Sequence, residues 1–182
     1  KSVFRFRRGR NARTIKPMRF RGMNTMDLAT QAATTIERLK PDAVFVDGGG
    51  VGGGVVDRLK MLGYRVIEVQ SGEKATDEEK YINKRIEMWG EMRDWLVHGC
   101  IDNDEALADD LTGPEYAVDL KGRLKLESKD SLKKRGLSSP DDADALALTF
   151  AEQVSRLDTA TARARYRGSN MVASSDYDVF AD

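Results

Sequence analysis

The chain has 182 residues, in which 30 Lys and Arg balance 30 Asp and Glu, with one His and one Cys. A lone cysteine excludes an internal disulfide, and the two residues cannot make a Cys/His zinc cluster, so a bound metal would need the oxygen ligands that Mg²⁺ or Mn²⁺ accept. No apolar run approaches the ~18 residues of a membrane span and no signal peptide is visible, so we expect a soluble, intracellular chain built around one core.

The N-terminal segment is basic, and apolar and basic residues alternate along it. Residues 1–26 contain no acidic residue, and SVFRFRR and TIKPMRFRG both alternate apolar and basic positions around the turn signal GRNA. This pattern predicts a β-hairpin with one face on a core and Pro17 on an edge strand. The charge fits a polyanionic partner, and a solvated strand face that resists aggregation is the alternative.

The next segment predicts a parallel strand-helix-strand unit after an amphipathic helix. Residues 25–40 carry an apolar stripe with helical spacing, and Pro41 follows its end. AVFVD is a short buried strand that ends at Asp47 and leads into GGGVGGG, a helix over residues 55–62 and the strand YRVIEV. A strand, a helix and a second strand in this order are typical of a right-handed parallel crossover.

Helices and a short strand pair are predicted for the rest of the folded region. Thr76 and Glu79 have capping-box spacing and predict a helix that stops at Gly99. A shorter helix is predicted over 103–112, and in RLKLE the residues Leu124 and Leu126 are expected to point inward.

These elements predict an α/β domain at residues 1–157, in which a mixed sheet of an antiparallel hairpin plus parallel strands is flanked by helices. From residue 158 to 182 the sequence has few large apolar residues and no period, which predicts a flexible tail. We expect a monomer.

The stretch SPDDADALALTF, residues 139–150, raises the question of function. Ser139 and Pro140 are typical of a helix start, and Asp141 and Asp142 then lie where the helix dipole favours negative charge. Asp144 lies three residues after Asp141 on a face that becomes apolar further along, so we expect both side chains to point at the sheet.

Two buried carboxylates close together need a cation between them, because like charges and desolvation both penalise the ionised forms. Asp47 ends a predicted parallel strand, and ligand sites form at the carboxyl ends of such strands. Asp47, Asp141 and Asp144 are therefore expected to converge on one or two divalent ions. Two such ions are the arrangement that activates water and stabilises the leaving oxygen in phosphodiester cleavage.

The glycine loop also allows a different class of function. Gly48, Gly50 and Gly53 satisfy the GxGxxG pattern of a dinucleotide-binding loop, and Glu68 lies where the ribose-binding acid would be expected, at the end of the next strand. That interpretation leaves Asp47 and the aspartate cluster without a role, so we consider it the weaker one.

The motifs carry a resemblance to a known family. FVDGGGVGGG, YINKRIEMWGEMRDWL, LKLESKDSLKKRG and SPDDADALAL, in this order, resemble the C-terminal nuclease domain of the large terminase subunit of tailed bacteriophages, over roughly residues 2–155. The resemblance implies a ribonuclease-H-like fold and an endonuclease that cuts concatemeric viral DNA with two Mg²⁺ or Mn²⁺ ions during packaging.

The resemblance also implies roles for individual residues. Asp47 matches the second catalytic acid of the family and Asp141 the third, Asp144 is similar to an assisting aspartate, and Asp142 is expected only to cap the helix. The first catalytic acid of the family lies on a strand that would precede Lys1, and the ATPase half that drives translocation is not in this chain.

Basic residues are the candidates for contact with DNA phosphates, with a solvated face as the equally plausible alternative. The candidates are Arg5, Arg7, Lys125, Lys129, Lys133 and Arg135. The resemblance implies double-stranded DNA, the terminase ATPase domain, the portal and the small terminase subunit as partners, no membrane, and the host cytoplasm as location. A non-catalytic DNA-binding or docking module of the packaging motor is the alternative function.

Overall fold

The computed structural model describes residues 1–154, which form a mixed α/β arrangement of short strands and helices. The strands are β1 (Ser2–Phe4), β2 (Asn11–Ala12), β3 (Met18–Phe20), β4 (Phe45–Asp47), β5 (Ile67–Val69), β6 (Cys100–Ile101), β7 (Tyr116–Val118) and β8 (Leu124–Leu126). The helices are α1 (Thr25–Leu39), α2 (Gly52–Met61), α3 (Lys84–Leu96), α4 (Glu105–Thr112), α5 (Lys129–Lys134) and α6 (Asp141–Ala147), and a short 3₁₀ turn, η1 (Leu148–Phe150), follows α6.

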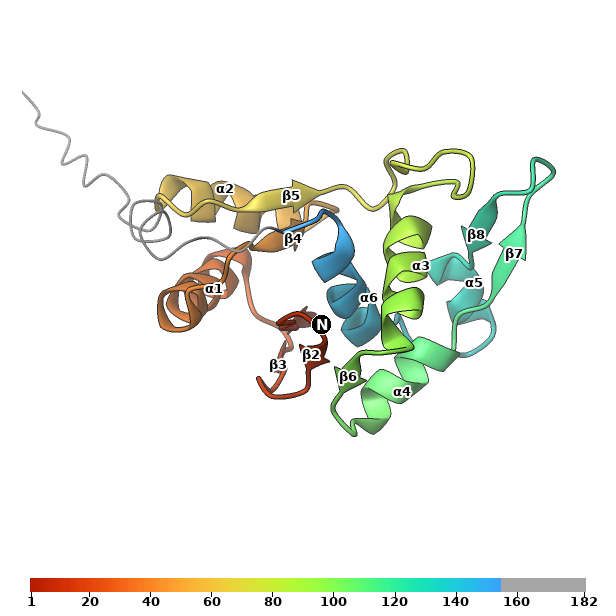
Figure 1. Cartoon of the computed structure of the whole chain (residues 1–182). Helices are drawn as coiled ribbons and strands as arrows, with labels where there is room; N and C mark the ends of the chain where they lie inside the picture. The colour runs from red at the N-terminus through yellow and green to blue at the C-terminus, as the bar shows by residue number, and fades with distance from the viewer. Residues whose placement is uncertain (155–182) are drawn as a thin grey trace, which may run out of the picture.

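Figure 1 shows α1 and α2 together at one end of the molecule, the β7–β8 hairpin at the other end, and α3 and α6 between them. The predicted tail from residue 158 lies outside the described residues. Within residues 1–154, no helix combines the length and the apolar character needed to cross a membrane.

The strands confirm the predicted mixture of parallel and antiparallel pairing. β1 pairs antiparallel with β3, β4 pairs parallel with β5, and β7 pairs antiparallel with β8. The N-terminal hairpin is less simple than predicted, because β2 lies between its strands in the sequence and pairs parallel with β6 instead. The pairs form four two-stranded sheets rather than one continuous sheet.

The β4–β5 pair separates two hydrophobic clusters. On one face, Val46 packs with α1 and α2, whose buried contacts include Ile36 and Leu59. On the other face, Phe45 packs against a larger cluster that contains Trp89 of α3 and Leu146 of α6. The short parallel pair is therefore covered on both sides, as strands of this kind require.

Helix α1 begins at the predicted residue, Thr25, and ends at Leu39, one residue before the predicted end. The Asn24 side chain accepts a hydrogen bond from the backbone N–H of Asp27, and Lys40 ends the helix in a left-handed conformation. The predicted inward orientation of Leu124 and Leu126 in β8 is also confirmed, since both are partly buried against the larger cluster.

The predicted start of the third helix is wrong. α3 begins at Lys84 with Asn83 as its cap, and residues 76–83 form turns. The reason is Glu87, whose carboxylate accepts hydrogen bonds from the backbone N–H groups of Thr76 and Asp77 and pairs with Lys84 at 2.7 Å. Glu87 thereby holds the segment as a loop against the first turn of α3.

A buried ion network fixes α6 against the N-terminal strands. The carboxylate of Asp142 has no solvent exposure and accepts hydrogen bonds from Lys1 at 2.6 Å, Arg5 at 2.7 Å and Arg19 at 2.9 Å. Arg5 in turn pairs with Asp102 at 2.9 Å, at the end of β6. One network therefore joins β1, β3, β6 and α6.

Two predictions are corrected by this network. Asp142 is not merely a cap at the helix start, and Arg5, predicted to contact DNA, is only 9% exposed. Burial alone would raise the pKa of Asp142, but hydrogen bonds from Arg19, Lys1 and Arg5 outweigh it and hold the pKa well below its ordinary value. The carboxylate is therefore ionised at neutral pH and neutralised by its three basic partners.

Replacement of Asp142 by Ala is expected to lower the free energy of unfolding by about 3–5 kcal/mol, because it leaves the Arg5 guanidinium buried without its partner. Urea denaturation at pH 7 measures the change. Asp130→Ala is the matched control, since the Asp130 side chain is 88% exposed and its replacement should change stability by less than about 0.5 kcal/mol. Equal stabilities for the two variants would contradict a structural role for the network.

Candidate functional site

Asp47 faces the α3–α6 side of the β4–β5 pair. Successive side chains of a strand point to opposite faces, so Asp47 shares its face with Phe45, while Val46 points to α1 and α2. Phe45 packs in the cluster that contains Ala143 and Leu146 of α6. The Asp47 carboxylate therefore lies at the carboxyl end of a parallel pair, on the face that α6 covers.

The glycine loop after Asp47 turns back onto this residue. The backbone N–H of Gly49 donates to the Asp47 side chain at 3.1 Å, and Gly50 has a positive φ of 59°. A Cβ on Gly52 would lie 1.7 Å from the backbone carbonyl oxygen of Asp47. Only glycine fits at this position, so the close turn itself explains the glycine at residue 52.

Glu68 does not occupy the position that a ribose-binding acid would need in a dinucleotide-binding domain. Glu68 lies inside β5 rather than at its end, because Val69 is the last residue of that strand. The Glu68 side chain contacts Lys60 at 3.5 Å and accepts a hydrogen bond from Gln70. A carboxylate engaged within the strand and with α2 is not presented at the strand end, where a ribose would bind.

Asp144 is surrounded by hydrogen-bond donors. Its Oδ1 accepts from the indole N–H of Trp89 at 2.9 Å and from Nε of Arg85 at 3.1 Å. Its Oδ2 accepts from Nη2 of Arg85 at 3.3 Å and lies 3.0 Å from the Lys129 ammonium. Each carboxylate oxygen thus has two donors, and two of the three partner side chains are cationic.

A short chain of contacts links Asp144 to Asp47. Asp47 is in register with Val69, and the backbone carbonyl of Ser71, two residues further on, accepts from the backbone N–H of Arg85. The Arg85 side chain then holds Asp144. These contacts connect α6 to the segment after β5, and Asp47 itself lies at the carboxyl end of β4, which is where ligand sites form in parallel sheets.

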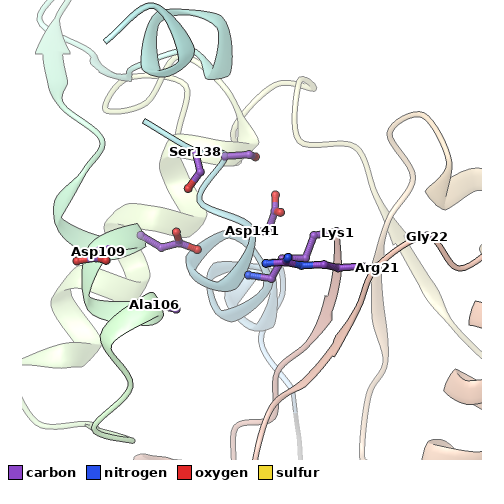
Figure 2. Close-up of a pocket in the computed structure, with 9 residues that line it drawn as sticks. Lys1, Arg21, Gly22, Ala106, Asp109, Ser138 and Asp141 are labelled. Carbon is purple, nitrogen blue, oxygen red and sulfur yellow. The ribbon is translucent and has the colours of Figure 1, made fainter. Parts of the chain in front are cut away.

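Asp141 lies in different surroundings. It lines a pocket of about 590 Å³ together with Lys1, Arg21, Gly22, Ala106, Asp109, Asp110, Ser138 and Ser139. Figure 2 shows the Asp141 side chain with Lys1 and Arg21 on one side and Asp109 of α4 on the other. This pocket belongs to the α4 side of α6, whereas Asp144 faces α3.

The start of α6 is held by a residue from another helix. Pro140, not the predicted Ser139, is the N-cap and makes no side-chain cap bond. Instead, the Asp110 carboxylate of α4 accepts from the backbone N–H of Asp142 at 2.8 Å. Burial raises the pKa of Asp110, although this hydrogen bond opposes the rise. The contact between α4 and α6 therefore holds the first turn of α6, which contains Asp141, Asp142 and Asp144.

The predicted convergence of three acids is not seen within residues 1–154. Among these residues, no group of three or more His, Cys, Asp or Glu could hold a metal ion. Asp47 ends β4, Asp144 pairs with Arg85 and Lys129, and Asp141 lines the α4 pocket. Carboxylate oxygens are the ligands that Mg²⁺ and Mn²⁺ prefer, but the carboxylate of Asp144 is already neutralised by Arg85 and Lys129, so a metal ion there would have to displace a cation.

The basic residues predicted to bind DNA divide into three groups. Like Arg5, Arg7 is engaged inside the protein: it donates to the backbone carbonyl of Thr149 at 2.7 Å and lies 4.1 Å from the centre of the Phe150 ring, and burial lowers its pKa. Lys125 and Lys133 are exposed, and Lys133 lies 4.0 Å from the exposed carboxylate of Asp130. They remain candidates for contact with phosphates.

The other two predicted residues are already paired. Lys129 is exposed and contacts Asp144, whereas Arg135 pairs with Glu115 at 3.1 Å and with Glu127. Either cation would exchange an internal partner for a phosphate if it bound DNA.

The sequence contained signals for some of the residues that were missed. Asp142 lies four residues before Leu146, so both share the buried face of α6. Arg85 and Trp89 also have the i, i+4 spacing of one helical face, and Trp89 is only 8% exposed. No sequence signal indicates Asp110, whose partner is a backbone group of a distant helix.

Comparison with solved structures shows the fold. No protein-family model and no curated protein sequence matches the chain. A point mutant of the nuclease domain of the large terminase subunit of bacterial virus Sf6, solved with manganese, is similar with a TM-score of 0.70 and 19% identity, over 82% of each chain.

Two further structures agree. The Sf6 nuclease domain itself has a TM-score of 0.66 and 19% identity over 83% of this chain and 81% of that chain. The large terminase nuclease from thermophilic phage G20c, with bound magnesium, has a TM-score of 0.53 and 18% identity over 75% and 66% of the two chains. The chain therefore has the α/β fold of these nuclease domains, as the resemblance predicted.

Replacement of Gly52 by Ala is expected to destabilise the protein by about 1–3 kcal/mol, since the added Cβ would overlap the Asp47 carbonyl and force the loop open. Thermal unfolding measures the loss. Gly72→Ala is the matched control, because a Cβ there meets no atom within 4 Å. A Gly52→Ala variant as stable as Gly72→Ala would contradict the close approach of loop and strand.

Proposed function

We propose that the chain is the metal-dependent endodeoxyribonuclease domain of a viral packaging terminase, with double-stranded DNA as its substrate. The observation that supports this most strongly is the fold shared with nuclease domains solved with manganese or magnesium, in which Asp47 ends the parallel strand β4. The ATPase domain, portal and small terminase subunit are the proposed partners, in the host cytoplasm.

Each part of the site has a distinct task in this proposal. Asp47 and Asp144 hold the divalent ions, which when bound supply activation of water and stabilisation of the leaving oxygen. The exposed backbone of Gly49 and Gly50 leaves room for a DNA strand to approach Asp47, because no side chain projects there. Asp141, which lines the pocket beside Lys1, has an accessory role at the edge of the proposed metal site.

The test is cleavage of supercoiled plasmid by the 182-residue chain in Mn²⁺. Asp47→Ala and Asp144→Ala are each expected to lower the cleavage rate at least about a hundredfold, because each removes a proposed metal ligand. Asp141→Ala should lose less activity than Asp144→Ala, and Asp130→Ala, at an exposed carboxylate, should cleave as fast as the unmodified chain. Undiminished cleavage by Asp47→Ala or Asp144→Ala would overturn the assignment.

A non-catalytic DNA-binding or docking module is the second candidate, and the lack of a three-acid group within residues 1–154 favours it. The two candidates differ in a simple way. A binding module would retain DNA on a gel in Mn²⁺ without cutting it, whereas the proposed nuclease converts supercoiled plasmid to nicked and linear forms.

DNA affinity is expected to depend on the exposed lysines of the β8–α5 region. Lys125→Ala combined with Lys133→Ala should weaken binding and reduce the salt dependence, because each lost phosphate contact releases about one fewer counterion. Fluorescence anisotropy in the Asp47→Ala background, over a series of salt concentrations, measures both. The control is Lys74→Ala with Lys40→Ala, two exposed lysines outside this region. An unchanged salt slope in the first pair would exclude this surface.

A further inference from the structure

The loop between β1 and β3 carries four cations that no group of the protein neutralises. We call residues 8–16 the basic loop; its cations are Arg8, Arg10, Arg13 and Lys16, and all four are exposed. Across the described residues 1–154, their side-chain nitrogen atoms have no hydrogen-bond or ion-pair partner. Arg19, on the neighbouring strand β3, is by contrast bound to two carboxylates. The loop therefore presents uncompensated positive charge to solvent.

The carboxylates nearest in sequence to the loop and to its partner strand are engaged elsewhere. Asp27, the first acidic residue of the sequence, accepts a hydrogen bond from the Asn24 side chain at 2.8 Å. β2 pairs with β6, and the acid that follows β6 is Asp102, which is bound to Arg5 at 2.9 Å and only 7% exposed. Because like charges close together repel one another and attract anions, the loop is suited to an anionic partner.

The backbone of the basic loop is held against the rest of the protein. The indole N–H of Trp95 donates to the carbonyl of Gly9 at 3.0 Å, and the backbone N–H of Cys100 donates to the carbonyl of Arg10 at 2.8 Å. Above Gly9 the space is open, since a Cβ there would meet no atom within 4 Å. A loop that is already ordered loses little conformational freedom when it binds, which favours affinity.

The composition of the loop favours phosphates over a protein surface. Three of the four cations are arginines, whose planar guanidinium can donate two N–H groups to one phosphate. Protein interfaces centre instead on large apolar side chains that become buried. In the basic loop, Ile15 is partly buried and Ala12 is buried, so neither is available as such an anchor.

The basic loop is separate from the exposed lysines of the β8–α5 region. Near the start of α3, Arg85 donates to the backbone carbonyl of Glu127, just beyond β8, at 3.1 Å. The loop is bound instead to Trp95, near the other end of α3, and Figure 1 shows β2 and β6 at that end. Ten residues of an α-helix span about 15 Å. The two surfaces would therefore contact different phosphates.

We propose that the basic loop is a second DNA-binding surface, which holds the phosphates of double-stranded DNA whatever their sequence. This inference rests on the proposed function for its choice of DNA as the partner, but it requires neither a metal ion nor cleavage. Contacts to phosphates position a protein on a duplex and carry no sequence information directly. The loop therefore adds affinity for any duplex.

The test compares two double variants that each remove two exposed arginines. Arg8→Gln combined with Arg13→Gln changes the loop. Arg38→Gln combined with Arg65→Gln is the matched control, because these two arginines are also exposed and have no ionic partner among residues 1–154. Fluorescence anisotropy in EDTA, over a series of salt concentrations, measures binding to two labelled duplexes of unrelated sequence. Thermal unfolding verifies that both variants are folded.

The loop variant should bind both duplexes about tenfold more weakly than the unmodified chain, and its salt slope should fall by about two, because two phosphate contacts are lost. The control variant should bind with the affinity and the salt slope of the unmodified chain. Equal affinities for the two variants would overturn the inference and leave an acidic protein as the partner of the loop. A loss confined to one duplex would also contradict it, since phosphates carry no sequence.

The same variants separate this inference from the proposed function. If the unmodified chain binds DNA through the loop but does not cleave plasmid in Mn²⁺, the inference stands and the nuclease proposal fails. If the unmodified chain cleaves plasmid while the loop variant binds DNA as tightly as the control, only the inference fails.

Discussion

The burial of the Asp142 carboxylate is the constraint on which the rest of the site depends. A buried carboxylate needs its partners on all sides, and Lys1, Arg5 and Arg19 supply them from the N-terminal strands. This requirement determines how α6 is rotated about its axis. Each residue of a helix is rotated by about 100° from the one before it. Asp144 comes two residues after Asp142, so its side chain points in nearly the opposite direction. That direction is toward α3, where Arg85 and Trp89 bind it.

The rotation of α6 and the pleat of β4 decide which way each candidate ligand faces. Strand alternation turns Asp47 to the face that packs on α6, and the glycine turn folds closely over its carbonyl oxygen. The same rotation leaves Asp141 in the α4 pocket, away from α3. Three carboxylates within four residues therefore have three separate surroundings: Asp142 joins the buried ion network, Asp144 pairs with α3 and α5, and Asp141 lines a pocket.

The sequence predicted the parts of the fold that depend on nearby residues. The strand ending at Asp47 and the start of α1 were confirmed because their signals lie within a few residues of each other. The pairing of Arg5 with Asp142 could not be foreseen, since these residues are 137 positions apart. The start of α3 was misplaced for a related reason: Glu87 captures backbone groups of the preceding loop, a tertiary contact that overrides the capping-box pattern at Thr76.

The central claim is that a divalent ion binds between Asp47 and Asp144. Anomalous X-ray diffraction from crystals of the chain grown with Mn²⁺ tests it most directly, because the manganese signal locates the ion without reference to the protein. The account predicts an anomalous peak in contact with carboxylate oxygens of both residues, with Arg85 still bound to Asp144. A peak confined to the pocket of Asp141 and Asp109, or no peak at all, would contradict it.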